Sequence, residues 1–176
     1  MFDTLIRWHC RTTSAVVRGV TSQLLEKLYG CEIRGEGIDA SVRFAHHARG
    51  CTIVAARICE NVVIYQNVTI GSNLRFNRTR GAWENVGTPI IARNVVVCDG
   101  ARILGPIVVG ENSVVAAAAI VTRDVPANSV VTGVNGIRPR DPAYDLVFRA
   151  DMIAPAEIIE ANRVRVEAFE KAGRGE

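Results

Sequence analysis

Two adjacent histidines, His46 and His47, are the residues of this chain best suited to acid–base chemistry. The 176 residues include three histidines, and the third is His9. Imidazole has an ordinary pKa near neutrality, so a histidine can take the proton of a hydroxyl group as its oxygen attacks an acyl carbon. A lone histidine is more often structural, but a pair directly before the Ala-Arg-Gly segment 48–50 favours a catalytic role for one of the two.

The composition excludes several other kinds of function. The net charge is only +3 and no basic stripe with interleaved aromatic residues occurs, so we expect no nucleic-acid partner. No apolar run reaches the roughly 18 residues of a transmembrane helix, and the N-terminus lacks the apolar core of a signal peptide. The cysteines are odd in number and without metal-ligand spacing, so we expect structural thiols in a cytoplasmic protein and no metal site: Cys10, Cys31, Cys51, Cys59 and Cys98.

A six-residue repeat must position the histidines. Large aliphatic residues recur at every sixth position, at Ile58, Ile64 and Ile70 and again at Ile91, Val97, Ile103, Val109, Val115 and Val121. A second series follows four positions later, with Val62, Val68, Val95, Ala101, Ile107, Ser113, Ala119 and Val125. This period fits neither an amphipathic helix nor an alternating strand, but it fits a chain that turns a corner every six residues. The sequence therefore predicts a mainly β fold, a parallel β-helix with short helices at its two ends.

The repeat divides the chain into three parts. Residues 1–30 are expected to be an N-terminal helix, with helical periodicity over 3–29 that ends at Gly30. Residues 31–138 form the β-helix domain, interrupted by an excursion loop at 72–87. Residues 139–176 form an extension with an amphipathic helix over 155–172, whose expected buried side carries Ile158, Ile159, Val166 and Phe169.

The repeat region resembles the hexapeptide-repeat acyltransferases, and within them the serine acetyltransferase-like branch. The carriers are His-His-Ala-Arg-Gly at 46–50, Gln-Asn-Val-Thr-Ile-Gly at 66–71, Gly-Ala-Arg-Ile-Leu-Gly at 100–105 and Asp-Val-Pro at 124–126. The resemblance implies a left-handed parallel β-helix that uses acetyl-CoA as acyl donor. It also implies a homotrimer with its active sites between subunits.

The resemblance also suggests the catalytic residues. The His-x-x-Gly spacing favours His47 as the general base, whereas counting from Gln66 favours His46, so both stay candidates. In serine acetyltransferases an acid that orients the imidazole lies fifteen positions before the base, and Glu32 occupies that place before His47.

Other residues are expected to bind the two substrates. The excursion loop carries arginines for an anionic group and a tryptophan for stacking, and with the repeat corners it gives the expected acceptor-binding residues Gln66, Asn67, Arg75, Arg78, Arg80, Trp83 and Thr88. The resemblance implies that coenzyme A lies along the later coils, at Ser72, Asp99, Ala117, Thr122 and Arg123.

Two departures from the serine acetyltransferases concern the amino-acid pocket. An acid precedes their catalytic histidine and a second histidine precedes a Pro-Lys-Ile segment, but His46 and Thr88 occupy these places here. We therefore expect an acetyl-CoA-dependent O-acetyltransferase that acts directly on a hydroxyl of a sugar or polysaccharide precursor. A serine O-acetyltransferase of cysteine biosynthesis is the alternative, and a non-catalytic β-helix interaction module is an alternative of another class.

Overall fold

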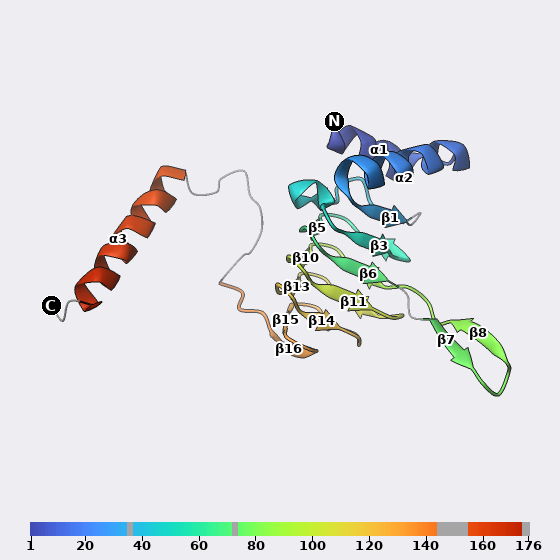
Figure 1. Cartoon of the computed structure of the whole chain (residues 1–176). Helices are drawn as coiled ribbons and strands as arrows, with labels where there is room; N and C mark the ends of the chain where they lie inside the picture. Colours follow the sequence, from blue (N-terminus) through green and yellow to red (C-terminus); the bar gives the residue numbers. More distant parts are fainter. Residues whose placement is uncertain (35–36, 72–73, 144–154, 174–176) are drawn as a thin grey trace. The chain divides into compact units, whose positions relative to one another are not determined.

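The computed structural model describes residues 1–34, 37–71, 74–143 and 155–173 (Figure 1). It consists of two compact units, Met1–Leu146 and Val147–Glu176, which are described separately. The first unit holds a stack of short parallel strands below two N-terminal helices. The second unit holds helix α3, Pro155–Gly173.

The strands stack into three faces of a prism. The first face carries β1 Glu32–Arg34, β3 Thr52–Val54, β6 Thr69–Gly71, β11 Arg102–Leu104 and β14 Ile120–Val121. The second face carries β2 Arg43–Phe44, β5 Val63–Ile64, β10 Val96–Val97, β13 Val114–Val115, β15 Ser129–Thr132 and β16 Gly136–Pro139. The third face carries β4 Arg57–Ile58, β9 Ile90–Ile91 and β12 Val108–Val109. Pairing within each face is parallel except between β15 and β16, and the isolated parallel bridges Ile38–Ile58 and Val109–Val125 extend the third face at its two ends.

The aliphatic side chains of the repeat fill the prism. The nine residues of the first series, from Ile58 to Val121, are all fully buried, as the six-residue period predicts. Each such side chain contributes about 1.5–3 kcal/mol of burial free energy. Strands of two to four residues thus hold together because their inward side chains stack from coil to coil.

Each coil turns at three corners, which form three edges of the prism. Between the third and second faces, each corner places an asparagine in the left-handed region: Asn61, Asn94, Asn112 and Asn128, with φ of 55° to 57°. Asparagine tolerates this conformation better than most residues. Each side-chain amide donates to the next asparagine carbonyl, at 3.3, 3.0 and 3.1 Å, so the asparagines form a hydrogen-bonded ladder.

The N-terminal region contains two helices, α1 Phe2–Arg11 and α2 Ala15–Tyr29, so the prediction of one helix over 3–29 is wrong at 12–14. The chain breaks there because the Ser14 side chain caps α2 by accepting a hydrogen bond from the Val17 amide. Gly30 ends α2 in the left-handed conformation, with φ of 64°. The buried face is formed by Phe2, Ile6, His9, Thr21 and Leu25, whereas the apolar residues Trp8, Val16, Val20 and Leu28 are exposed.

Two further segments leave the prism. The excursion loop forms an antiparallel hairpin of β7 Leu74–Asn77 and β8 Ala82–Asn85, which projects from the coils in Figure 1. In α3, Ile159, Val166 and Phe169 are exposed within the chain, and the side chain of Ile158 lies outside the described part, so the expected burial of this face stays a prediction. None of the helices in the described ranges is long and apolar enough to cross a membrane.

Candidate active site

The two adjacent histidines lie on an enlarged corner between the second and first faces, called here the histidine edge. Phe44 pairs with Ile64, and Ile53 pairs with Ile70. The chain takes nine residues from Phe44 to Ile53 but only six from Ile64 to Ile70. The extra residues form the short turn η1, Ala45–Ala48, which contains both histidines.

The turn η1 holds three consecutive non-glycine residues in the left-handed region. His46, His47 and Ala48 have φ of 51°, 59° and 53°. This conformation costs roughly 1–2 kcal/mol for each such residue. Strained backbone of this kind concentrates at functional sites, because the surrounding structure must hold it in place. The turn therefore marks this corner as the candidate active site.

The two imidazole rings have different surroundings. The His47 ring lies 5.4 Å from the Phe2 ring of α1 and 5.7 Å from the Tyr29 ring of α2, measured between centroids. The His46 ring lies 6.4 Å from the ring of Tyr65, in the next coil. Both histidines remain exposed, so both rings are open to a substrate.

A column of residues continues below η1 along the same edge. Backbone hydrogen bonds join Asn67 N to Arg49 O, Gly100 N to Gln66 O and Ala118 N to Asp99 O, at 2.7, 3.2 and 2.8 Å. These bonds stack the corners at the strand spacing of about 4.8 Å. The expected binding residues Gln66, Asn67, Asp99 and Ala117 therefore share one edge of the prism with the two histidines.

The polar side chains of this column differ in how well they are satisfied. The Asn67 side-chain amide donates to Asp99 Oδ1 at 3.0 Å. Gln66 Oε1, in contrast, is buried with no hydrogen-bond partner among the described residues. A buried acceptor without a partner costs about 1–3 kcal/mol, so this atom marks a place where a donor is missing.

The expected orienting acid has another partner within the chain. Glu32 lies in β1, and its carboxylate accepts from Arg34 Nε at 2.7 Å. No hydrogen bond joins Glu32 to either histidine of η1 in the described structure. An orienting role for Glu32 therefore stays a prediction.

The thiol beside this corner is not a nucleophile at neutral pH. Cys51 is buried, and its Sγ donates to the Tyr65 carbonyl oxygen at 3.2 Å. Burial raises the pKa of the Cys51 thiol to about 11. A histidine, not a cysteine, is the group that can react here.

The remaining expected residues lie on another edge, between the first and third faces, called here the hairpin edge. Arg75 and Arg80 of the hairpin pair with Glu84 at 2.8 and 3.6 Å, and the Trp83 ring packs edge-on against Phe76 at 5.5 Å. Arg78 lies in the exposed tip of the hairpin, and Thr88, Thr122 and Arg123 lie at corners of the same edge, whereas Ser72 lies outside the described residues. One chain therefore does not bring these residues to the two histidines.

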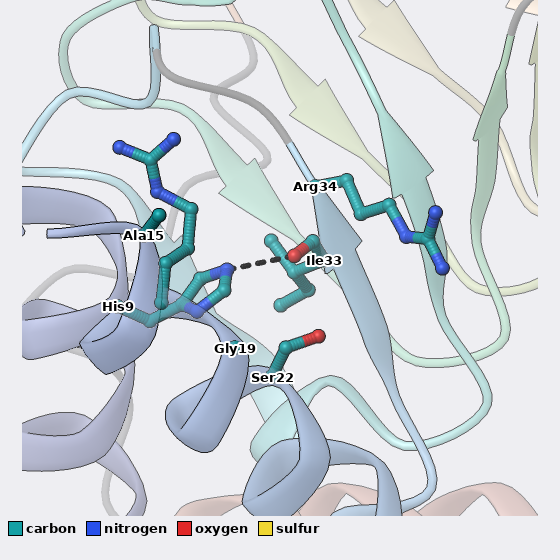
Figure 2. Close-up of a pocket in the computed structure, with 7 residues that line it drawn as sticks. His9, Ala15, Gly19, Ser22, Ile33 and Arg34 are labelled. Carbon is teal, nitrogen blue, oxygen red and sulfur yellow. Dashed lines mark hydrogen bonds between the residues drawn. The ribbon is translucent and has the colours of Figure 1, made fainter. Parts of the chain in front are cut away.

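The third histidine, His9, is buried in the N-terminal helix pair. Its Nε2 lies 2.7 Å from the Ile33 carbonyl oxygen, shown dashed in Figure 2, and its Nδ1 lies 2.9 Å from Thr21 Oγ1. Burial lowers the pKa of His9, and the positive charge of Arg18 lowers it further. His9 thus ties both helices to β1 and takes no part in the candidate site.

Sequence reasoning missed the aromatic residues that support His47. Phe2 is buried, and its ring lies 5.0 Å from Tyr29 and 6.4 Å from Phe44, so a cluster of three aromatic rings stands beside η1. Phe2 precedes any periodic pattern in the sequence. Tyr29, directly before the helix-ending Gly30, offered the only local signal.

Comparisons with known proteins support the repeat-region resemblance. No protein-family model matches the chain. It is 34% identical over 135 residues to the serine acetyltransferase of Synechococcus elongatus, which covers 73% of this chain and 50% of that protein. It is 39% identical over 106 residues to a Schizosaccharomyces pombe protein provisionally named a serine acetyltransferase, over 60% of this chain and 37% of that one. The chain thus spans about half or less of the length of these relatives.

Solved structures show the same fold. The crystal structure of Neisseria gonorrhoeae serine acetyltransferase superposes with a TM-score of 0.54 at 24% identity, over 74% of this chain and 47% of that chain. This likeness confirms the predicted left-handed parallel β-helix.

The same comparisons correct one expectation. The prediction of a sugar or polysaccharide acceptor is wrong, because the relatives in sequence are named as serine acetyltransferases. The two departures at His46 and Thr88 affect single side chains, whereas the relationship extends over most of the repeat. Over its repeat region, this chain is a homologue of the serine acetyltransferase-like branch of the hexapeptide-repeat acyltransferases.

Proposed function

We propose that this protein is an acetyl-CoA-dependent O-acetyltransferase whose acceptor is the hydroxyl group of L-serine, as in the first step of cysteine biosynthesis. The observation that carries this proposal is the strained turn η1. It presents two exposed histidines at an enlarged corner of a fold shared with serine acetyltransferases. A β-helix without catalysis would have no need of such a turn.

The reaction requires one base and no covalent enzyme intermediate. His47, with His46 as the alternative, takes the hydroxyl proton while the serine oxygen attacks the thioester carbonyl carbon. A carbon–oxygen bond forms, and backbone amides at the corners stabilise the oxyanion. The carbon–sulfur bond then breaks, and the leaving thiolate of coenzyme A takes the proton from the imidazolium.

The buried acceptor Gln66 Oε1 suits recognition of an amino acid. It lies one coil below Arg49, at the corner that follows η1. A bound serine ammonium group would supply the missing hydrogen-bond donor. The carboxylate of serine would in turn find positive charge at the exposed Arg49.

Donor binding fits the lower part of the same edge. Ala117 and Ala118 are exposed and have short side chains, so they leave room for the slim pantetheine arm. The thiol end would then point up the column, past Asp99, towards the histidines.

A homotrimer would complete the site. The expected residues of one chain lie on two edges, with the histidines on one and the hairpin, Thr88, Thr122 and Arg123 on the other. In a trimer of prisms, the hairpin edge of one subunit faces the histidine edge of its neighbour. A cytoplasmic location is part of the proposal, because that compartment contains acetyl-CoA and keeps thiols such as the free cysteines of this chain reduced.

The test is release of coenzyme A thiol with L-serine as the acceptor, for the wild type and for His46→Asn and His47→Asn. Asparagine tolerates positive φ, so both variants keep the turn and remove only the base. We expect one variant to lower kcat/KM by about 100-fold or more and the other by much less. L-Threonine and glucose serve as alternative acceptors.

Two results would contradict the proposal. If both asparagine variants release thiol with serine as fast as the wild type does, neither histidine is the general base. A folded wild type that releases no thiol with serine would favour a non-catalytic module.

A further inference from the structure

His47 packs against one aromatic ring from each N-terminal helix. Its ring centroid lies 5.4 Å from Phe2 of α1 and 5.7 Å from Tyr29 of α2, with interplanar angles of 57° and 51°. Both distances lie within the range of favourable contacts between aromatic rings, about 4.5–7 Å. The two helices at the end of the prism (Figure 1) therefore reach the candidate active site directly.

The two helix rings are themselves held in place. Phe2 is buried, and its ring contacts Tyr29 edge-on at 5.0 Å and Phe44, the residue directly before η1, at 6.4 Å. Tyr29 is the last residue of α2, and the carbonyl oxygen of Gly30 accepts a hydrogen bond from the Gly50 amide at 3.0 Å. Because Gly50 closely follows η1, the end of α2 and the histidine turn are joined through the backbone as well as through side chains.

The strained turn holds the backbone of His47 but not its ring. The backbone conformation does not by itself fix the side-chain torsions, so an exposed imidazole can occupy several rotamers. A general base acts only when its nitrogen points at the proton that it removes, and a misplacement of about 1 Å can cost about 100-fold in rate. Contact with two rings restricts the rotamers that the His47 imidazole can adopt.

The neighbouring histidine is placed differently. The ring of His46 lies 6.4 Å from the ring of Tyr65, which is farther than either ring contact of His47 with the helices. The contacts with α1 and α2 thus distinguish the two histidines, which their sequence positions do not.

We propose that Phe2 and Tyr29 are positioning residues that orient the His47 ring for proton transfer, which makes His47 and not His46 the general base. This inference deepens the proposed function and rests on it. It gives the N-terminal helices a part in the reaction, in addition to the packing of α2 against β1.

Substitutions of Tyr29 separate a ring contact from a general loss of packing. Tyr29→Phe keeps the ring and removes the hydroxyl, whereas Tyr29→Leu removes the ring and keeps apolar bulk. We expect Tyr29→Leu to lower kcat for thiol release with L-serine by about tenfold, with KM for both substrates unchanged. Tyr29→Phe should keep kcat within about twofold of the wild type.

Two further variants complete the series. Phe2→Leu should lower kcat as Tyr29→Leu does, and circular dichroism establishes that it is folded before it is assayed. If Phe2→Leu does not fold, the two Tyr29 variants decide the proposal. Trp8→Leu removes an exposed ring of the same helix, so it is the matched control and should change neither kcat nor KM.

A double-mutant cycle tests whether Tyr29 acts through His47. In a His46→Asn background, Tyr29→Leu should again lower kcat by about tenfold. In a His47→Asn background it should change the residual rate by less than about twofold, because no imidazole is left at that position to orient. A general disturbance of the fold would lower the rate in both backgrounds.

Three results would overturn the proposal. The first is an unchanged kcat in Tyr29→Leu, and the second is an equal loss in Tyr29→Leu and Tyr29→Phe. The third is a larger loss of kcat in His46→Asn than in His47→Asn. In each of them the wild type still acetylates serine, which separates failure of this inference from failure of the proposed function, where the wild type releases no thiol.

Discussion

The three histidines lie in different surroundings although they are the same kind of residue. His46 and His47 could be singled out from the sequence because they are adjacent and precede a turn signal. The role of His9 could not be predicted, because its partners Thr21 and Ile33 are 12 and 24 positions away and meet it only after the helices pack. The strain in η1 was equally hidden, since a left-handed backbone at a histidine has no sequence signal.

At the residue scale, burial of His9 predicts a loss of stability in mild acid. Its pKa is lowered in the folded state from an ordinary value of 6.5, so the unfolded chain binds a proton more readily. The free energy of unfolding should therefore fall as the pH drops from about 7 through 6.5 and level off below the folded-state pKa. Urea denaturation at a series of pH values measures this slope.

The control for this prediction is the variant His9→Gln, which cannot titrate. Its stability should show a smaller pH dependence over the same window. An unchanged slope in His9→Gln would exclude His9 as the group responsible.

Elements that follow a local period could be predicted, and those that depend on distant packing could not. The hexad register predicted the inward positions from Ile58 to Val125, because each strand repeats the same environment one coil further on, but it did not extend to Ile33, Ile38 and Ile53 of the first coils. The orientation of α1 and α2 was less accessible. Their sequences offer more apolar residues than one face can bury, and packing in the first unit buries Phe2, Ile6 and Leu25 but leaves Trp8, Val20 and Leu28 exposed.

At the element scale, the packing of α1 predicts different costs for two aromatic residues. Phe2 is 3% exposed and lies in the aromatic cluster beside His47, whereas Trp8 is 65% exposed on the same helix. Phe2→Ala should lower the free energy of unfolding by about 3 kcal/mol. Trp8→Ala should change it by less than about 0.5 kcal/mol. Equal losses in urea denaturation would show that α1 does not pack as described.

For the whole molecule, the class of fold and the branch of the family could be predicted from the sequence, but the acceptor could not. The sugar interpretation rested on the identity of two side chains, His46 and Thr88. The placement of the expected site residues on two edges was also beyond prediction. It depends on which corner carries the hairpin, and so on the number of residues between β6 and β9.

At this scale, the division into two units predicts that α3 is dispensable for folding of the prism. A chain that ends at Leu146 should keep the urea midpoint of the full chain within error, because the last coil is closed by β16. A chain that ends at Asn135 removes β16 and the partly buried Ile137, so it should lose about 2 kcal/mol. A large loss of stability in the chain that ends at Leu146 would mean that α3 stabilises the prism directly.

The asparagine ladder links the architecture to chemical ageing. Asn112 and Asn128 each precede a serine, a small residue that does little to hinder deamidation. At Asn112, conversion of the side-chain amide to a carboxylate would remove the donor to Asn128 and set a negative charge against the Asn128 side-chain carbonyl oxygen. The rigid coils slow this reaction by fixing the backbone, so damage would accumulate mainly while the edge is open. The rate at which the protein loses function through deamidation would then depend on how often its coils unfold locally.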